Sequence, residues 1–330
     1  MTFSLPLVGV GVLQAVVYLL FIRAVDLYER ESLLYVIPVF VWGFTVAVAV
    51  ALVFNTLAAI TLSSVADRQT VSFVTAVFVA PPVEECSKGL ALFLAFGVSY
   101  LASRKRGAIE FSGVMDGIVY GAAVGFGFSI AEDLLYYAQF GPETFVVRRI
   151  FGGFGHAAFT SLTGVGIGLI PWVRSYFLKF SLPLLGLAGA ITLHATFNFL
   201  GSVIGPLAYL FMLVILLLYA VLIGVWLAVE RRTIRGELRD EASAGVISHQ
   251  EYEILPTYFR RTGYYLRLIF TGRLATERRA RKLHAAAVDL AFSKRLARSS
   301  HSHSQEARLQ ELRSRIKTLR GAAPTAERTL

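Results

Sequence analysis

Seven long apolar runs fill most of the first 230 residues, and they limit what this chain can fold into. A helix needs about 20 apolar residues to cross the hydrocarbon core of a bilayer, which is about 30 Å thick. Runs of that order cover residues 5–22, 33–62, 71–101, 114–140, 150–173, 182–204 and 207–229. Only 16% of all residues are charged, whereas soluble domains carry about 25%. The sequence therefore predicts an all-α, polytopic membrane helix bundle with about seven transmembrane helices.

The third run, residues 71–101, is too long for one straight span, because at about 1.5 Å per residue it would extend over roughly 46 Å. It contains Pro81 and Pro82. Proline is poor inside a helix but well tolerated in its first turn. We therefore expect the helix to break and restart at these prolines, deep in the membrane.

Charge is divided unevenly along the chain, and the division predicts two regions. Residues 1–230 hold 11 Lys+Arg and 12 Asp+Glu, a net charge of −1. Residues 231–330 hold 21 Lys+Arg and 10 Asp+Glu, a net charge of +11, so the two regions sum to the +10 of the whole chain. We expect a polytopic membrane domain over residues 1–230 and a basic, soluble, helical tail over residues 231–330.

The basic tail also predicts an orientation, since basic segments beside a span are typical of the cytoplasmic side. With the tail inside, seven spans put the N-terminus outside, and the inside loops then hold seven Lys and Arg residues against three outside. The sequence thus predicts a multi-pass plasma-membrane protein with a cytoplasmic tail. Residues 258–274 interleave aromatic and arginine side chains, which favours contact with anionic lipid. No nucleic-acid partner is expected, because no recognised nucleic-acid-binding module occurs.

Several ionisable and strongly polar residues lie inside the apolar runs, where a charge costs about 2.5–3.5 kcal/mol and is a hint of function. Four successive runs contain them: Glu84, Glu85, Lys88, Asp116, Glu132, Asp133, His156, His194 and Asn198. At about 100° per residue, Lys88 falls between Glu84 and Glu85 on the helix surface and can pair with either carboxylate. A helix cap alone does not require two adjacent acids and a lysine, so these three residues indicate a functional site.

The remaining polar residues are spread over the next three runs. Glu132 is flanked on its own face by Phe128 and Tyr136, so we expect it to be functional, whereas we expect Asp133 to be solvated near the membrane edge. His194 and Asn198 are one turn apart and point the same way.

Two chemistries suit histidines and glutamates that meet in one bundle. One is a metal site with His and carboxylate ligands and an open position for water. The other is a metal-free site where a glutamate acts as general base and His and Asn stabilise the oxyanion. The single cysteine, Cys86, excludes a cysteine-based zinc cluster.

Four motifs, in order and one to a run, give the chain a likeness to a known family: Glu84-Glu85-x-x-Lys88, Phe128-x-x-x-Glu132, His156 and His194-x-x-x-Asn198. With these motifs the sequence resembles the PrsW family of intramembrane proteases, which belongs with the CAAX-prenyl-endopeptidase-like glutamate proteases. The likeness covers roughly residues 20–200. Asp133 is a departure, since the family pattern has Asn beside the glutamate.

The resemblance implies hydrolysis of a peptide bond in a membrane-bound protein substrate; known relatives act on membrane-bound anti-sigma factors. The catalytic residues it implies are Glu84, Glu85, Lys88, Glu132, His194 and Asn198. Glu85 is favoured over Glu84 as the residue that activates water together with Glu132, directly or through a divalent metal such as Zn²⁺. If a metal is present, the implied ligands are Glu85, Glu132, His156 and His194.

Two other functions remain open at this point: a proton- or ion-coupled transporter, because intramembrane Glu and His also form relays, and a catalytically inactive membrane scaffold. The spatial arrangement of four residues distinguishes the first from a protease. If Glu85, Glu132, His156 and His194 meet within a few ångströms, hydrolysis is favoured. If they line a path across the membrane, transport is favoured.

Overall fold

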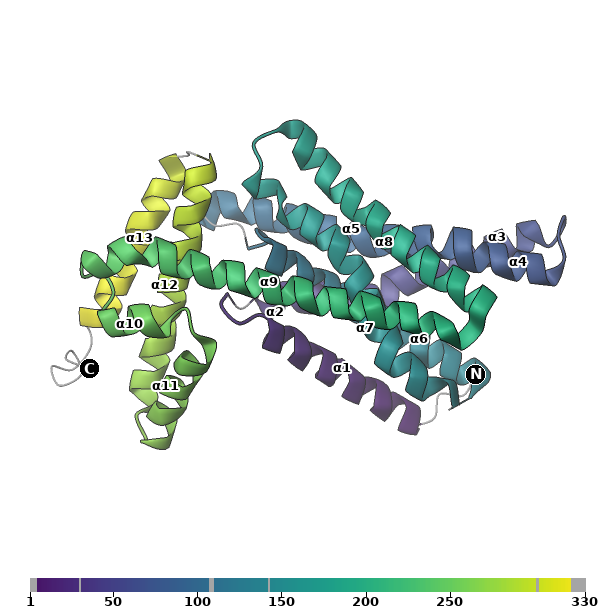
Figure 1. Cartoon of the computed structure of the whole chain (residues 1–330), viewed down its shortest axis with the longest axis horizontal. Coiled ribbons are helices and arrows are strands. Elements are labelled where there is room, and N and C mark those ends of the chain that lie inside the picture. Colours follow the sequence, from purple (N-terminus) through teal and green to yellow (C-terminus); the bar gives the residue numbers. More distant parts are fainter. Residues whose placement is uncertain (1–4, 30, 107–109, 142, 301–302, 322–330) are drawn as a thin grey trace. The chain divides into compact units, whose positions relative to one another are not determined.

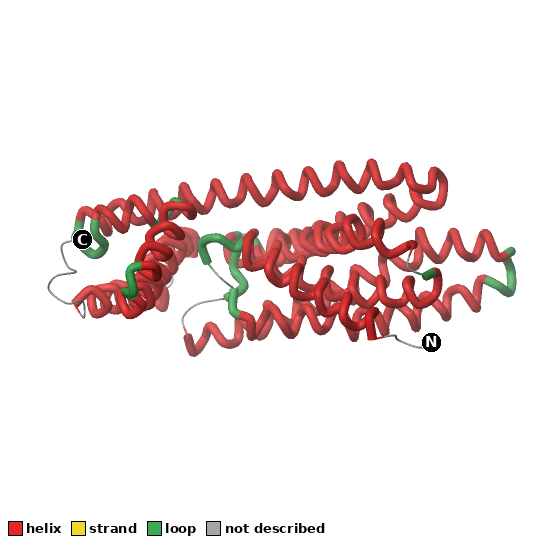
Figure 2. The backbone as a smooth tube through the Cα atoms, turned by 90° about the horizontal axis from the view of Figure 1, so that it is seen from below, coloured by secondary structure: helices red, strands yellow, loops and turns green. Residues whose placement is uncertain are grey.

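The computed structural model describes residues 5–29, 31–106, 110–141, 143–300 and 303–321, and this part of the chain is helical with short connecting loops (Figures 1 and 2). The α-helices are α1 (Leu5–Val25), α2 (Leu33–Trp42), α3 (Val48–Leu62), α4 (Arg68–Val74), α5 (Ala80–Arg106), α6 (Val114–Phe140), α7 (Glu143–Gly168), α8 (Tyr176–Ile204), α9 (Ala208–Ser243), α10 (His249–Ile254), α11 (Tyr258–Phe270), α12 (Leu274–Ser300) and α13 (His303–Gly321). Two π-helical turns, η1 (Gly43–Ala47) and η2 (Thr75–Val79), and two 3-10 turns, η3 (Ile170–Trp172) and η4 (Gly205–Leu207), complete the list.

The helices form two compact units. Unit 1 comprises Met1–Asp26, Glu31–Ala102 and Glu110–Ile223, and unit 2 comprises Leu27–Arg30, Ser103–Ile109 and Gly224–Leu330. The boundary between the two units therefore lies within α9, between Ile223 and Gly224. The predicted division into residues 1–230 and 231–330 stays a prediction.

Within the described residues, five helical stretches are long and apolar enough to cross a membrane: Leu33–Leu62, Arg68–Ser103, Val114–Gln139, Gly152–Trp172 and Tyr176–Ser243. Gly9–Val25 is a shorter apolar helix, and Tyr176–Ser243 contains both α8 and α9. Each of the seven predicted runs is thus helical, which confirms the all-α membrane bundle. The number of spans remains a prediction.

The helix does not break at Pro81 and Pro82 as expected, but α5 does begin at Ala80, with both prolines in its first turn. The chain stays helical from Arg68 to Ser103, and the prolines lie inside this stretch, at the start of α5 and directly after the π-helical turn η2. In this turn the N–H of Ala80 donates to the carbonyl of Thr75, five residues earlier. A wider turn tolerates proline because it relaxes the α-helical pattern in which the missing N–H would be needed.

A stripe of glycines on α6 brings α7 into backbone contact. A Cβ atom on Gly121 would lie 2.5 Å from the Cα of Ser161, and one on Gly125 would lie 2.6 Å from the carbonyl carbon of His156. Such distances are closer than side chains allow, so only glycine permits this approach. The stripe fixes the position of His156 beside α6.

Unit 2 has an apolar core of its own. It is formed by the last part of α9 with α12, α13 and the intervening loops, and includes Ile234, Leu238, Val246, Ile247, Leu255, Leu283, Leu290, Leu312 and Ile316. The carboxylate of Glu241 joins three of these helices, because it accepts from Lys294 (3.0 Å) and Arg313 (2.7 Å).

His284, on α12, is a neutral histidine in the core of unit 2. It is 3% exposed, and the hydroxyl of Tyr265 lies 2.8 Å from its Nδ1. Burial, together with the charge of Arg261, lowers the pKa of His284 to about 3.

The stability of unit 2 should therefore fall in acid. The unfolded histidine takes up a proton below about pH 6.5, whereas the folded one does so only near pH 3. Through this window the free energy of unfolding falls by up to about 1.4 kcal/mol per pH unit. His284→Asn, which keeps an acceptor for Tyr265, should remove this slope. Amide-exchange protection of α12 in the full-length protein, followed against pH, measures this slope. Equal slopes in the wild type and in the His284→Asn variant would contradict the assignment of His284 as a buried, neutral histidine.

Candidate active site

The four sequence motifs converge inside unit 1. Four successive long helices contribute: α5 (Glu84, Glu85, Lys88), α6 (Glu132), α7 (His156) and α8 (His194, Asn198). A continuous series of side-chain contacts runs from Glu132 through His156, Lys88 and Glu85 to His194, and each step is 3.1 Å or shorter. This is the arrangement that favours hydrolysis over transport.

Lys88 is the centre of this cluster and is 0% exposed. Its Nζ donates to Glu85 Oε1 (2.9 Å) and Glu84 Oε2 (3.3 Å), and it lies 3.1 Å from His156 Nδ1. The ammonium also lies 3.7 Å from the ring centroid of Phe128, a cation–π contact. The sequence predicted the pairing with both glutamates, and the structure confirms it.

Glu85 is surrounded by donors. Besides Lys88, its carboxylate is contacted by His194 Nδ1 at 3.0 Å and by the Thr160 hydroxyl at 2.9 Å. It is 0% exposed. Thr160 was missed from the sequence, although it lies one helical turn after His156 and so shares its face.

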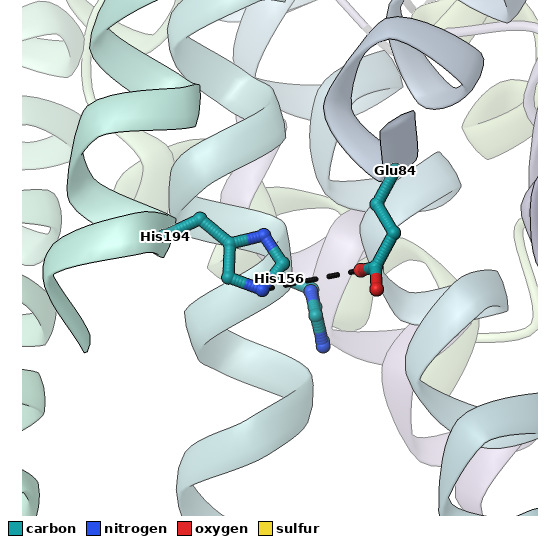
Figure 3. A group of neighbouring side chains, drawn as sticks. All are labelled: Glu84, His156 and His194. Atoms are coloured by element: carbon teal, nitrogen blue, oxygen red, sulfur yellow. Dashed lines mark ion pairs between the residues drawn. The ribbon is translucent and has the colours of Figure 1, made fainter. Parts of the chain in front are cut away.

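Glu84 and His194 face each other across a gap. Because a carboxylate only accepts, Nδ1 of His194 is the nitrogen that donates to Glu85, and Nε2 carries a lone pair. That Nε2 lies 3.9 Å from Glu84 Oε2 (Figure 3). Lys88 donates to the same carboxylate oxygen from another side, and a cation between Glu84 and the lone pair of His194 would satisfy both acceptors.

His156 has a different pattern of partners. Lysine only donates, so Nδ1 of His156 accepts from Lys88, and Nε2 donates to Glu132 Oε2 at 2.9 Å. The Glu132 side chain is 21% exposed, more than the other acids of the cluster.

A cavity of about 800 Å³ opens beside the cluster. The site residues that line it are Glu84, Glu132, His156, His194 and Asn198, with further polar side chains from Asn55, Ser72, Tyr136, Gln139 and Ser202. Glu85 and Lys88 are buried behind this wall. Glu84 and Glu132 therefore face the cavity, whereas Glu85 does not.

Asn198 is held by the irregular helix before α5. Its Nδ2 donates to the Ala76 carbonyl at 2.8 Å. In the π-helical pattern that carbonyl would accept from Pro81, which has no N–H. The proline thus frees the acceptor that Asn198 uses.

The expectation that Asp133 is solvated is wrong. Asp133 is 3% exposed, and Gln14 Nε2 of α1 donates to its Oδ2 at 2.9 Å. Asp133 lies about 100° around α6 from Glu132, and this rotation turns it toward α1 rather than water. Of the two neighbouring acids, Glu132 is the one beside the cavity.

Glu84, His156 and His194 are the residues whose arrangement fits a metal ion. One ligand atom from each lies within 4.8 Å of the others, and all three are buried. Two histidines and a carboxylate form a donor set of the kind that catalytic zinc sites use. Carboxylates also contact the second ring nitrogen of both histidines, Glu85 on His194 and Glu132 on His156, as is usual for metal-binding histidine.

The fit has one condition. The lone pair of His156 is at Nδ1, where Lys88 donates, so a metal would take the place of that donor. The sequence-based ligand set contained Glu85 and Glu132; the three residues grouped by the structure contain Glu84 instead.

Comparison with known proteins agrees with this chemistry. Residues 31–226 match the model of the PrsW family, described as intramembrane metalloproteases. The chain is 29% identical over 185 residues to "Protease PrsW" of Geobacillus kaustophilus (strain HTA426), an alignment that covers 54% of this chain and 74% of that relative. No solved structure matches the chain. Because the family model spans more than half of the chain and includes every site residue named above, the chain belongs to the PrsW family of intramembrane metalloproteases.

Proposed function

We propose that unit 1 cleaves a membrane-anchored protein at the cavity, with a divalent metal, Zn²⁺, held by Glu84, His156 and His194. The observation that supports this most is the opposition of Glu84 and His194 across 3.9 Å on the wall of a cavity of about 800 Å³. When bound, such a metal supplies Lewis-acid polarisation of water and of the scissile carbonyl.

Glu132 is the proposed general base. Its carboxylate lines the cavity, and it is the more exposed acid, so it can take a proton from a water molecule there. The Nε2–H of His156, 2.9 Å away, orients the carboxylate. Geometry of this kind, with the base within hydrogen-bond reach of a fixed partner, is what general-base catalysis requires.

Asn198 is the proposed donor to the oxyanion. An amide nitrogen carries two hydrogens, and one of them donates to Ala76. The amide also lines the cavity, which supports assigning the second hydrogen to the developing negative charge.

Glu85 is a positioning residue in this proposal. It accepts from His194, Lys88 and Thr160, so it fixes the tautomer of His194 that presents Nε2 to the cavity. Glu84 thus takes the metal-binding role for which the sequence favoured Glu85.

The charges of the cluster support a divalent ion. Glu84, Glu85 and Glu132, when ionised, contribute −3, and Lys88 contributes +1, which leaves −2. A divalent cation makes the buried cluster neutral. Burial of an uncompensated charge is costly, so the count favours two positive charges over one.

The family resemblance implies a membrane-anchored protein substrate, and we propose a regulator of the anti-sigma-factor kind for that role. We further propose that the protein lies in the plasma membrane with its N-terminus outside and its basic region, residues 231–330, in the cytoplasm and in contact with anionic lipid. The net charge of +11 in that region supports both statements.

Conservative variants of the adjacent acids test the assignment of ligands. Glu84→Gln should abolish both stoichiometric metal and cleavage of a membrane-spanning peptide, because it removes a ligand. Glu85→Gln should keep the site but weaken metal affinity by about 10–100-fold, as loss of a supporting hydrogen bond does. Cys86→Ser, on the exposed side of the same turn, is the control. Full cleavage by Glu84→Gln, or full cleavage by a metal-free wild type after chelation, would overturn the metal proposal.

Thr160 offers a second test with a matched control. Thr160→Val removes the donor to Glu85 and should weaken metal affinity, up to about tenfold on the scale of supporting residues, while Thr160→Ser should restore it. Thr163→Val on the same helix removes a buried hydroxyl that has no hydrogen-bond partner among the described residues and should change nothing. Metal competition with a chelator measures the affinity. Equal affinities for the Thr160→Val and Thr163→Val variants would contradict the role of Thr160.

Reporter fusions test the orientation. A reporter that is active only in the cytoplasm should be active after Leu330, and one that is active only outside should be active before Met1, because seven spans put the two ends on opposite sides. Activity of both fusions on one side would mean an even number of spans.

A further inference from the structure

Helix α11 of unit 2 exposes aromatic side chains and buries an arginine. Phe259 and Phe270 are each 84% exposed, whereas Arg261 is 8% exposed. Arg261 donates to the carbonyl of Leu27 and lies 5.5 Å from the ring of Tyr28. The ordinary preference for charged residues outside and aromatic residues inside is reversed here, so the exposed aromatics need an explanation.

The exposed residues form one continuous stripe. Phe259, Gly263, Leu266 and Phe270 follow the i, i+4, i+7, i+11 spacing of a single helical face. All are exposed, and Leu274, at the start of α12, continues the apolar surface with 50% exposure. We call these five residues the α11 stripe.

Arginines flank the stripe. Arg260 and Arg267 lie about 100° from it around the helix, and Arg273 follows the helix end. All three are exposed. The opposite side of α11, with Tyr265 and Leu268, packs into unit 2. An apolar face with basic residues along its edge is the pattern of a helix that lies in the plane of a membrane surface.

The first turn of α11 is held in place by contacts within unit 2. The hydroxyl of Tyr28 donates to the Pro256 carbonyl at 2.9 Å, and Arg261 donates to Leu27.

We propose that the α11 stripe inserts into the membrane interface and that Arg260, Arg267 and Arg273 bind anionic lipid headgroups. The choice of lipid over a protein partner rests on charge complementarity, because three exposed arginines border an exposed apolar face. This inference deepens the lipid contact proposed for the basic region, and it is independent of the proteolytic site, because the α11 stripe contains no site residue. Its failure would therefore leave the protease assignment unchanged.

Spin labels on the full-length protein test the insertion. The chain has one cysteine, so Cys86→Ser gives a background for single labels at Phe259→Cys or Phe270→Cys. Gln310→Cys, on an exposed position of α13, is the matched control. In nanodiscs of phosphatidylcholine with phosphatidylglycerol, we expect labels at 259 and 270 to be reached by oxygen dissolved in lipid rather than by a water-soluble nickel chelate. The label at 310 should show the reverse.

The charge variant tests the headgroup contact. Combined Arg260→Gln, Arg267→Gln and Arg273→Gln should lower the ratio of inserted to free α11 by about fivefold per arginine, since each is worth about 1 kcal/mol near an anionic surface. The loss should appear with phosphatidylglycerol and not in phosphatidylcholine alone. Equal accessibility of the labels at 259, 270 and 310 to oxygen and to the nickel chelate would overturn the insertion. Insertion that is the same with and without phosphatidylglycerol would overturn the contact with anionic headgroups. Spin–spin broadening between labels at 259 would instead identify a second copy as the occupant.

Discussion

The backbone contact between α6 and α7 is the constraint on which the site depends. Gly121 and Gly125 let α7 approach so closely that a Cβ atom on either would lie within 2.6 Å of its backbone. The contact fixes the backbone of His156 beside Gly125, about two helical turns before Glu132, and from there the two side chains reach each other at 2.9 Å. Hydrocarbon gives no hydrophobic drive between helices, so close packing and polar contacts must supply the association.

The second constraint is the cost of buried charge. Lys88 has no exposure to solvent, and its carboxylate partners lie on its own helix, at 2.9 and 3.3 Å. The local spacing of the motif therefore compensates the ammonium before any other helix packs. The other three helices bring in one further acid and two histidines, and they leave an excess of negative charge on the cavity side. That excess is what supports the proposed divalent cation.

The sequence was sufficient for the helices and for selecting the motif residues, because run length and the position of charged residues within each apolar run report directly on the membrane. Whether the motifs meet or line a path across the membrane was left open and needed the structure. The sequence was not sufficient where the rotation of a helix about its axis decides which of two adjacent side chains faces the cavity. Glu84 and Glu85 differ by about 100° around α5, and this difference places one on the cavity and the other among three donors. The same rotation separates Glu132 from Asp133, which Gln14 binds from a different helix. No local pattern identifies such a partner 119 residues away.

The prolines show how a local irregularity becomes part of the site. Pro81 cannot donate, so the π-helical turn before it leaves the Ala76 carbonyl available, and Asn198 of α8 binds it. His194 is one turn before Asn198 and points the same way. Anchoring Asn198 therefore also sets the rotation of α8 that brings His194 to Glu85. The proline pair and the His-x-x-x-Asn motif are then two halves of one contact, which gives a physical reason for their occurrence together.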